Sequence, residues 1–136
     1  GIMRKWVLSN KKTRANVNIS VEVKNKVTFL AQQLVDNKLK PLHIKKHKGK
    51  KDHNYIDDIY VRWYRNYFYF CAKYKSLSSN SIVPEFELKF ARLEYQVNEN
   101  YNLSYLRHNN NWFEIGRDIN LDSCLSTIGE GALFTP

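Results

Sequence analysis

A change in hydrophobic periodicity near residue 56 constrains the fold of this chain more than any other feature. Before it, apolar residues recur at intervals of three and four positions, which is the spacing along one face of an α-helix. These residues are Val23, Val27, Leu30 and Leu34, with Phe29 and Val35 widening the same stripe. After it, apolar and polar residues alternate, as in a sheet with one buried face. The sequence therefore predicts an α+β fold, in which an antiparallel sheet of about five strands packs on one main N-terminal helix.

The chain divides into a basic arm at residues 1–19 and a single predicted domain at residues 20–136. A lysine-rich segment, residues 42–54, lies inside the domain and contains five Lys and three His. With almost nothing to bury, this segment predicts an exposed loop, or at best an edge strand at residues 42–45.

The main helix should span residues 20–39. Ser20 precedes the apolar stripe, and its hydroxyl can accept a hydrogen bond from a backbone N–H of the first turn. Pro41 should end the helix, because a proline ring clashes with the preceding turn and has no N–H to donate.

The alternating region separates into strands at short turns. Arg65 and Asn66 lie between two alternating runs and predict a tight hairpin, since Asn accepts a positive φ. The expected strands are 56–64, 67–74, 85–97, 101–107 and 112–115. A short C-terminal helix should follow through residues 121–128, capped by Asp118, Asn120 or Asp122 and ended by Gly129 and Gly131.

Positive charge is concentrated in the first part of the chain. The net charge is +9, yet residues 1–54 hold 14 basic and 3 acidic side chains, whereas residues 55–136 hold 8 and 10. Lysines that neutralise phosphates release counterions, which gives salt-sensitive affinity for nucleic acid. The alternative is a segment that serves only solubility. The candidate phosphate contacts are Lys11, Lys12, Arg14, Lys45, Lys46, Lys48, Lys50 and Lys51.

Tyrosines gather on the polar face of the predicted hairpin. In a simple register, Tyr60, Arg62 and Tyr64 share this face with Tyr67, Tyr69 and Lys73. Tyrosines interleaved with cations can stack unpaired bases, which makes Arg62, Tyr64 and Tyr67 candidate nucleic-acid contacts. Two alternatives remain open: the face forms an oligomer interface, or it is ordinary half-buried structure.

Glu87 and Lys89 form an E-x-K pattern that strand alternation places on one face. Together with an upstream carboxylate such as Asp58, this is the skeleton of restriction-type nuclease sites, in which carboxylates hold Mg²⁺ and the lysine steadies the water or phosphate. The same pattern also arises as a cross-strand charge pair. Asp58, Glu87 and Lys89 are therefore candidate catalytic residues only under a nuclease hypothesis.

Other chemistry is weakly indicated. His43, His47 and His53 lie among lysines that would repel zinc, so we expect exposed histidines and no metal site. Cys71 and Cys124 form no C-x-x-C pair and should be reduced, buried thiols in a cytoplasmic protein. We expect no cofactor, and no apolar run is long enough to span a membrane.

Several segments in the C-terminal half resemble a known family. They are Pro84, residues 89–95 (KFARLEY), residues 102–107 (NLSYLR) and Asn111-Trp112. The chain is similar, over about residues 20–134, to the bacterial domain-of-unknown-function family 3024. The resemblance implies a layout: an N-terminal helix, an aromatic hairpin, three further strands, a short helix and a terminal aromatic residue. It implies no activity.

This chain departs from that family at two places. Phe113-Glu114-Ile115 stand where members have His and Tyr after the last Trp, so a site that uses that His does not carry over. Tyr105 stands where a Trp is usual.

The sequence is consistent with three functions. The first is a non-enzymatic protein that binds DNA or RNA mainly through phosphates, with base stacking on tyrosines. The second is a protein–protein module, either a homodimer or a partner of an acidic protein. The third is a small metal-dependent nuclease, and of these the sequence favours the first.

Overall fold

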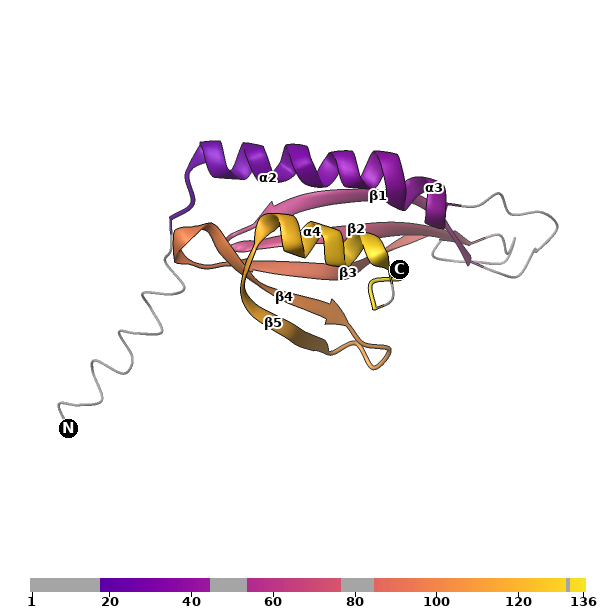
Figure 1. Cartoon of the computed structure of the whole chain (residues 1–136). Helices are drawn as coiled ribbons and strands as arrows, with labels where there is room; N and C mark the ends of the chain where they lie inside the picture. The colour runs from indigo at the N-terminus through magenta and orange to yellow at the C-terminus, as the bar shows by residue number, and fades with distance from the viewer. Residues whose placement is uncertain (1–17, 45–53, 77–84, 132) are drawn as a thin grey trace.

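A five-stranded antiparallel sheet forms the centre of the fold, and the helices lie on one of its faces (Figure 1). The computed structural model describes residues 18–44, 54–76, 85–131 and 133–136. The strands follow one another in the order of the chain: β1 (Asn54–Tyr64), β2 (Tyr67–Ser76), β3 (Glu85–Tyr95), β4 (Asn100–Leu106) and β5 (Trp112–Asn120). The α+β class predicted from the sequence is confirmed.

The main helix begins where the sequence predicts and ends later. It comprises α2 (Val21–Leu34), a π-helical turn at Val35–Leu39, and the short helix α3 (Lys40–His43). The Ser20 hydroxyl accepts a hydrogen bond from the Val23 N–H at 3.1 Å, which confirms the predicted cap.

The prediction that Pro41 ends the helix is wrong, and the π-helical turn explains why. In this turn the backbone N–H of Lys40 donates to the carbonyl of Val35, five residues earlier rather than four. The wider turn changes the position of the preceding carbonyls that a proline ring would otherwise meet. Leu42 and His43 are consequently helical, not part of a loop or an edge strand.

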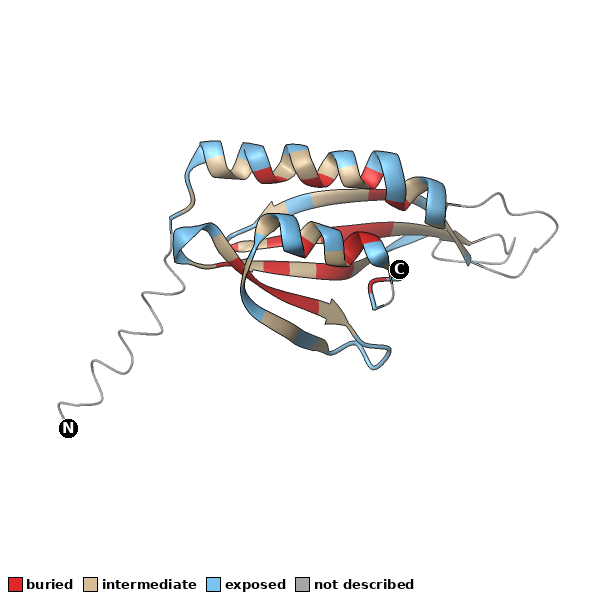
Figure 2. Cartoon of the chain, in the orientation of Figure 1, coloured by how far each residue is buried: buried red, intermediate tan, exposed pale blue. Residues whose placement is uncertain are grey.

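The core lies between the helices and the sheet (Figure 2). The helix buries a stripe with strict four-residue spacing, composed of Val27, Ala31, Val35 and Leu39. Such a stripe drifts around a helix with 3.6 residues per turn, and the wider π-helical turn compensates for the drift. The buried face of the helix is therefore rotated relative to the stripe predicted from the sequence. Leu30 and Leu34 are only partly buried, and Phe29 is 62% exposed.

The hairpin between β1 and β2 has the predicted turn. Tyr64 pairs with Tyr67 and Arg62 pairs with Tyr69, so Arg65 and Asn66 form the connection. The positive φ falls on Arg65 (56°) rather than on Asn66. Asn66 is buried instead, and its carbonyl accepts a hydrogen bond of 2.8 Å from the Tyr95 N–H of β3.

A bulge in β3 changes which residues face the helices. Phe70 pairs with Ala91 and Cys71 pairs with Lys89, which leaves Phe90 as an extra residue on β3. A single added residue reverses the alternation of side chains along a strand. Phe90 and the residues Ala91, Leu93 and Tyr95 are all buried toward the core as a result.

The C-terminal helix covers the part of the core that lies beside α2, over β4 and β5. Strand β5 extends further than predicted and leads directly into α4 (Leu121–Glu130). Of the three candidate caps, Asn120 is used, since its side-chain oxygen accepts from the Ser123 N–H at 2.8 Å. Gly131, with φ of 82°, ends the helix. Within the described residues, no helix has the length and apolarity needed to span a membrane.

We expect Phe70→Ala to lower the free energy of unfolding by about 3–5 kcal/mol, because Phe70 is fully buried and its removal leaves a cavity between the sheet and the helices. Urea unfolding followed by circular dichroism measures the change. The matched control is Phe29→Ala on the exposed side of α2, which should change stability by less than about 0.5 kcal/mol. Equal losses in both variants would contradict this placement of the core.

Candidate functional site

The face of the sheet opposite α2 and α4 carries most of the residues singled out from the sequence. No helix in the described part of the chain covers this face (Figure 1), which we call the open face. Strand register assigns to it Tyr60, Arg62, Tyr64, Tyr67, Tyr69, Cys71, Lys73, Glu87, Lys89, Arg92, Glu94, Asn102, Ser104, Trp112 and Glu114. The hairpin tyrosines and Arg62 therefore share one face, as the simple register predicts.

Glu87 organises one half of the open face. Its carboxylate accepts hydrogen bonds from the Tyr60 hydroxyl, from Arg62 Nη2 at 2.8 Å and from Lys89 Nζ at 3.2 Å. Burial alone would raise the pKa of Glu87, but these three donors favour the ionised form and hold the pKa below its ordinary value. The pKa of Tyr60 is raised, first by burial and then by its bond to Glu87. The Glu87 carboxylate thus stays ionised and accepts hydrogen bonds from three side chains.

The candidate nuclease residues are only partly brought together. Glu87 and Lys89 are in contact, whereas Asp58 accepts from Lys40 Nζ at 3.3 Å and from the Ile59 N–H at 2.8 Å. Over the ranges that the structure describes, no group of three or more His, Cys, Asp or Glu side chains is placed to hold a metal ion. This arrangement does not supply the carboxylate cluster that Mg²⁺ binding at Glu87 would need.

An arginine held between aromatic rings organises the other half of the open face. The guanidinium carbon of Arg92 lies 4.9 Å from the ring centre of Tyr67 and 4.8 Å from that of Trp112. Tyr69 extends the group, with its ring 6.0 Å from Trp112 and with Lys89 Nζ 5.6 Å above it. Cations over aromatic faces are attracted by the ring quadrupole.

Sequence reasoning missed Arg92 and Trp112 for a physical reason. Straight alternation from Phe86 would place Arg92 on the same face as Phe90, toward the core. The bulge at Phe90 reverses the alternation and turns Arg92 to the open face. Trp112 comes from the far edge strand, β5, and only tertiary structure brings its ring to within 6.0 Å of the ring of Tyr69 on β2.

The remaining predicted phosphate contacts lie outside the described residues. They are Lys11, Lys12, Arg14, Lys45, Lys46, Lys48, Lys50 and Lys51, and His47 and His53 lie outside them as well. The described fold still shows where these segments join it. Trp63 Nε1 donates to the carbonyl of Lys24 near the start of α2, and Lys40 pairs with Asp58 near the start of β1. The helix is therefore antiparallel to β1, and the two basic segments join at opposite ends of that strand.

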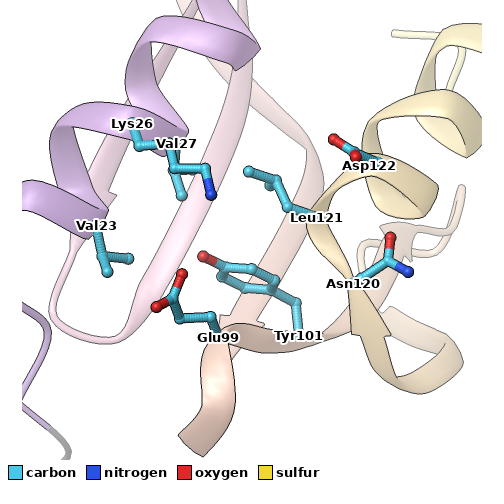
Figure 3. Close-up of a pocket in the computed structure, with 8 residues that line it drawn as sticks. All are labelled: Val23, Lys26, Val27, Glu99, Tyr101, Asn120, Leu121 and Asp122. Atoms are coloured by element: carbon cyan, nitrogen blue, oxygen red, sulfur yellow. The ribbon is translucent and has the colours of Figure 1, made fainter.

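A cleft lies on the helix-covered side of the sheet. It has a volume of about 170 Å³ and is lined by Val23, Lys26, Val27, Glu99, Tyr101, Asn120, Leu121 and Asp122 (Figure 3). Tyr101 is 1% exposed, and its pKa is raised by burial and by the neighbouring Tyr95 and Glu99. Asn98 and Glu99 both have positive φ, of 71° and 59°, in the turn Val97–Glu99 that carries the chain from β3 to β4.

The fold and the open face define a small α+β protein whose five-stranded meander is covered by helices on one face within the residues that the structure describes. The model of the family described as "Domain of unknown function (DUF3024)" matches residues 19–136, and the chain belongs to that family. The resemblance found in the sequence is thereby confirmed. Comparison with curated proteins and with solved structures finds no match.

We expect Glu87→Gln to lower the free energy of unfolding by about 1–2 kcal/mol at pH 7, because Arg62 and Lys89 lose a charged acceptor. The folded-state pKa of Glu87 lies below the unfolded value of about 4.3, so its stabilisation is present above that pH. The stabilisation is lost as the pH falls through the folded-state pKa. Urea unfolding at pH 7 and at about pH 3 should therefore show the gap between wild type and variant closing in acid.

The control for this experiment is Glu130→Gln, an exposed carboxylate at the end of α4, which should leave stability within about 0.5 kcal/mol at both pH values. If the loss of unfolding free energy in Glu87→Gln were the same at pH 7 and at acid pH, this result would contradict an electrostatic origin of the effect.

Glu99→Gly should raise the free energy of unfolding by about 0.5–1 kcal/mol, because a glycine adopts a positive φ without the steric cost that a Cβ brings. Glu99→Ala is the matched control, since it removes the carboxylate and keeps the Cβ. Urea unfolding measures both, and equal behaviour of the two variants would show that the turn is not strained.

Proposed function

We propose that this protein binds single-stranded nucleic acid without acting on it chemically. Bases would stack on the open face, and the basic arm and lysine-rich segment would neutralise phosphates. The observation that carries the proposal is the open face itself, which combines five aromatic side chains with cations and has no covering helix in the described part of the chain.

Aromatic exposure supports stacking on this face. Tyr64 is 56% exposed, and Tyr67, Tyr69 and Trp112 are half-buried with their rings held by neighbouring cations. Every base has an aromatic face, so such platforms tolerate different sequences, and they select unpaired strands because paired bases are already stacked. DNA and RNA both satisfy this requirement.

The distribution of charge supports phosphate neutralisation mainly by other parts of the chain. The described residues contain twelve Lys and Arg and twelve Asp and Glu, so the net charge of +9 lies entirely outside them. The basic segments join the fold at opposite ends of β1, about 33 Å apart at 3.3 Å per residue. A single-stranded nucleic acid that contacts both basic segments would therefore run parallel to the β-strands of the sheet.

The proposal places the protein in the cytoplasm, where nucleic acid is its partner. Both cysteines, Cys71 and Cys124, are unpaired and buried, and burial raises the pKa of the Cys71 thiol to about 11 and that of Cys124 to about 12. Protonated, buried thiols fit a reducing compartment and take no part in the proposed binding.

Fluorescence anisotropy with labelled single strands of about 16 nucleotides, DNA and RNA, tests the proposal. Affinity should fall steeply between about 50 and about 200 mM salt. Tyr64→Ala should weaken binding by about 1–3 kcal/mol, while Phe29→Ala, an exposed aromatic on α2, should leave it unchanged. Replacing Lys45, Lys46, Lys48, Lys50 and Lys51 together with Gln should flatten the salt dependence.

No binding at low salt, or affinity that does not depend on salt, would refute the proposal. Light scattering of the same samples addresses the protein–protein alternative. A homodimer that Tyr64→Ala dissociates would identify the open face as a dimer interface instead.

A further inference from the structure

Arg92 differs from the other cations of the open face, because no carboxylate pairs with it within the described residues. Arg62 and Lys89 both bind Glu87, and Lys73 lies 4.0 Å from Glu85. The sheet therefore neutralises these cations internally and leaves Arg92 charged and unpaired.

Aromatic rings fix the orientation of Arg92. Tyr67 of β2 and Trp112 of β5 lie within 5 Å of its guanidinium carbon, at 4.9 and 4.8 Å, and contribute cation–π attraction. These rings occupy the faces of the guanidinium, whereas its N–H donors lie in the plane of the group. Held in this way, the side chain loses little further freedom when a ligand binds.

The donors of Arg92 lack acceptors in this structure. Its Nε is buried without a hydrogen-bond partner, and its terminal nitrogens form no hydrogen bond with any described residue. The Nε–H is therefore a costly unsatisfied donor, whereas the two terminal nitrogens are not fully buried and could donate to an oxyanion at the edge of the guanidinium. A planar fork suits two oxygens of one phosphate or carboxylate, which a lysine ammonium cannot match.

We infer that Arg92 is the phosphate anchor of the open face and donates to two oxygens of a single backbone phosphate. This inference rests on the proposed function, since it names the group of the nucleic acid that this face binds directly. Stacked bases and an anchored phosphate would then share one surface, because Tyr67 and Trp112 both flank Arg92 and present aromatic area beside it.

Two carboxylates near Arg92 oppose anion binding. Glu94 lies two residues along β3, and Glu114 lies on β5 beyond Ser104. Arg117 pairs with Glu114 and offsets its charge. The site therefore suits one phosphate at the arginine edge rather than a run of phosphates, which the basic segments would have to hold.

The test combines NMR of the wild-type protein with binding by variants. Titration with inorganic phosphate and with single-stranded oligonucleotide should shift the Arg92 Nε–H resonance and saturate. Arg92→Lys and Arg92→Gln should each weaken oligonucleotide binding at least about tenfold, since neither retains the fork. Arg117→Lys is the matched control, an exposed arginine already paired with Glu114, and should change affinity less than about twofold.

The outcomes separate this inference from the proposed function. If oligonucleotide binds and both Arg92 variants bind as tightly as wild type, the anchor is wrong and the proposed function stands. If no oligonucleotide binds, the proposed function fails and the anchor, as a contact to a backbone phosphate, fails with it; a saturating shift with inorganic phosphate would then assign Arg92 to the phosphate of another ligand. A shift with acetate but not with phosphate would overturn it in favour of a carboxylate partner.

Discussion

Both faces of the sheet depend on the bulge in β3, where Phe90 is an extra residue opposite β2. Because of it, Ala91 and Leu93 continue the buried face, while Arg92 reaches the aromatic rings of the open face. Without it, Arg92 and Glu94 would point toward the helices and into the hydrophobic core. Burying unpaired charges costs several kcal/mol, so the bulge is required by the charged residues that follow it.

Much of the fold is predictable from the sequence because its signals are local. The cap at Ser20 and the turn at Arg65-Asn66 depend on a few neighbouring residues, and both are found. Pro41 shows the limit of such rules. Its usual effect on a helix is cancelled by a wider turn that carries Val35 and Leu39 into the core, and packing of this kind is not encoded within a short window.

The candidate site divides in the same way. Tyr64 and Tyr67 were predictable as neighbours because they flank a two-residue turn and register follows from it. The partners of Arg92 were not, because its contacts join β2, β3 and β5 and require the bulge. For Glu87, the sequence correctly predicted that it shares one face with Lys89. The hydrogen bonds that Tyr60 and Arg62 donate to its carboxylate were not predictable, because they join two strands that are not adjacent in the sheet.

The charge of the chain takes on a more specific meaning once the fold is known. The described residues carry equal numbers of acidic and basic side chains, and the excess of +9 belongs to segments that join them at the two ends of β1. Long-range attraction of a polyanion and close recognition would therefore reside in different parts of the protein. Within the open face the charges around Glu87 neutralise one another, so under the proposed function recognition would concentrate at the half where Arg92 lies between two aromatic rings and has no carboxylate partner among the described residues.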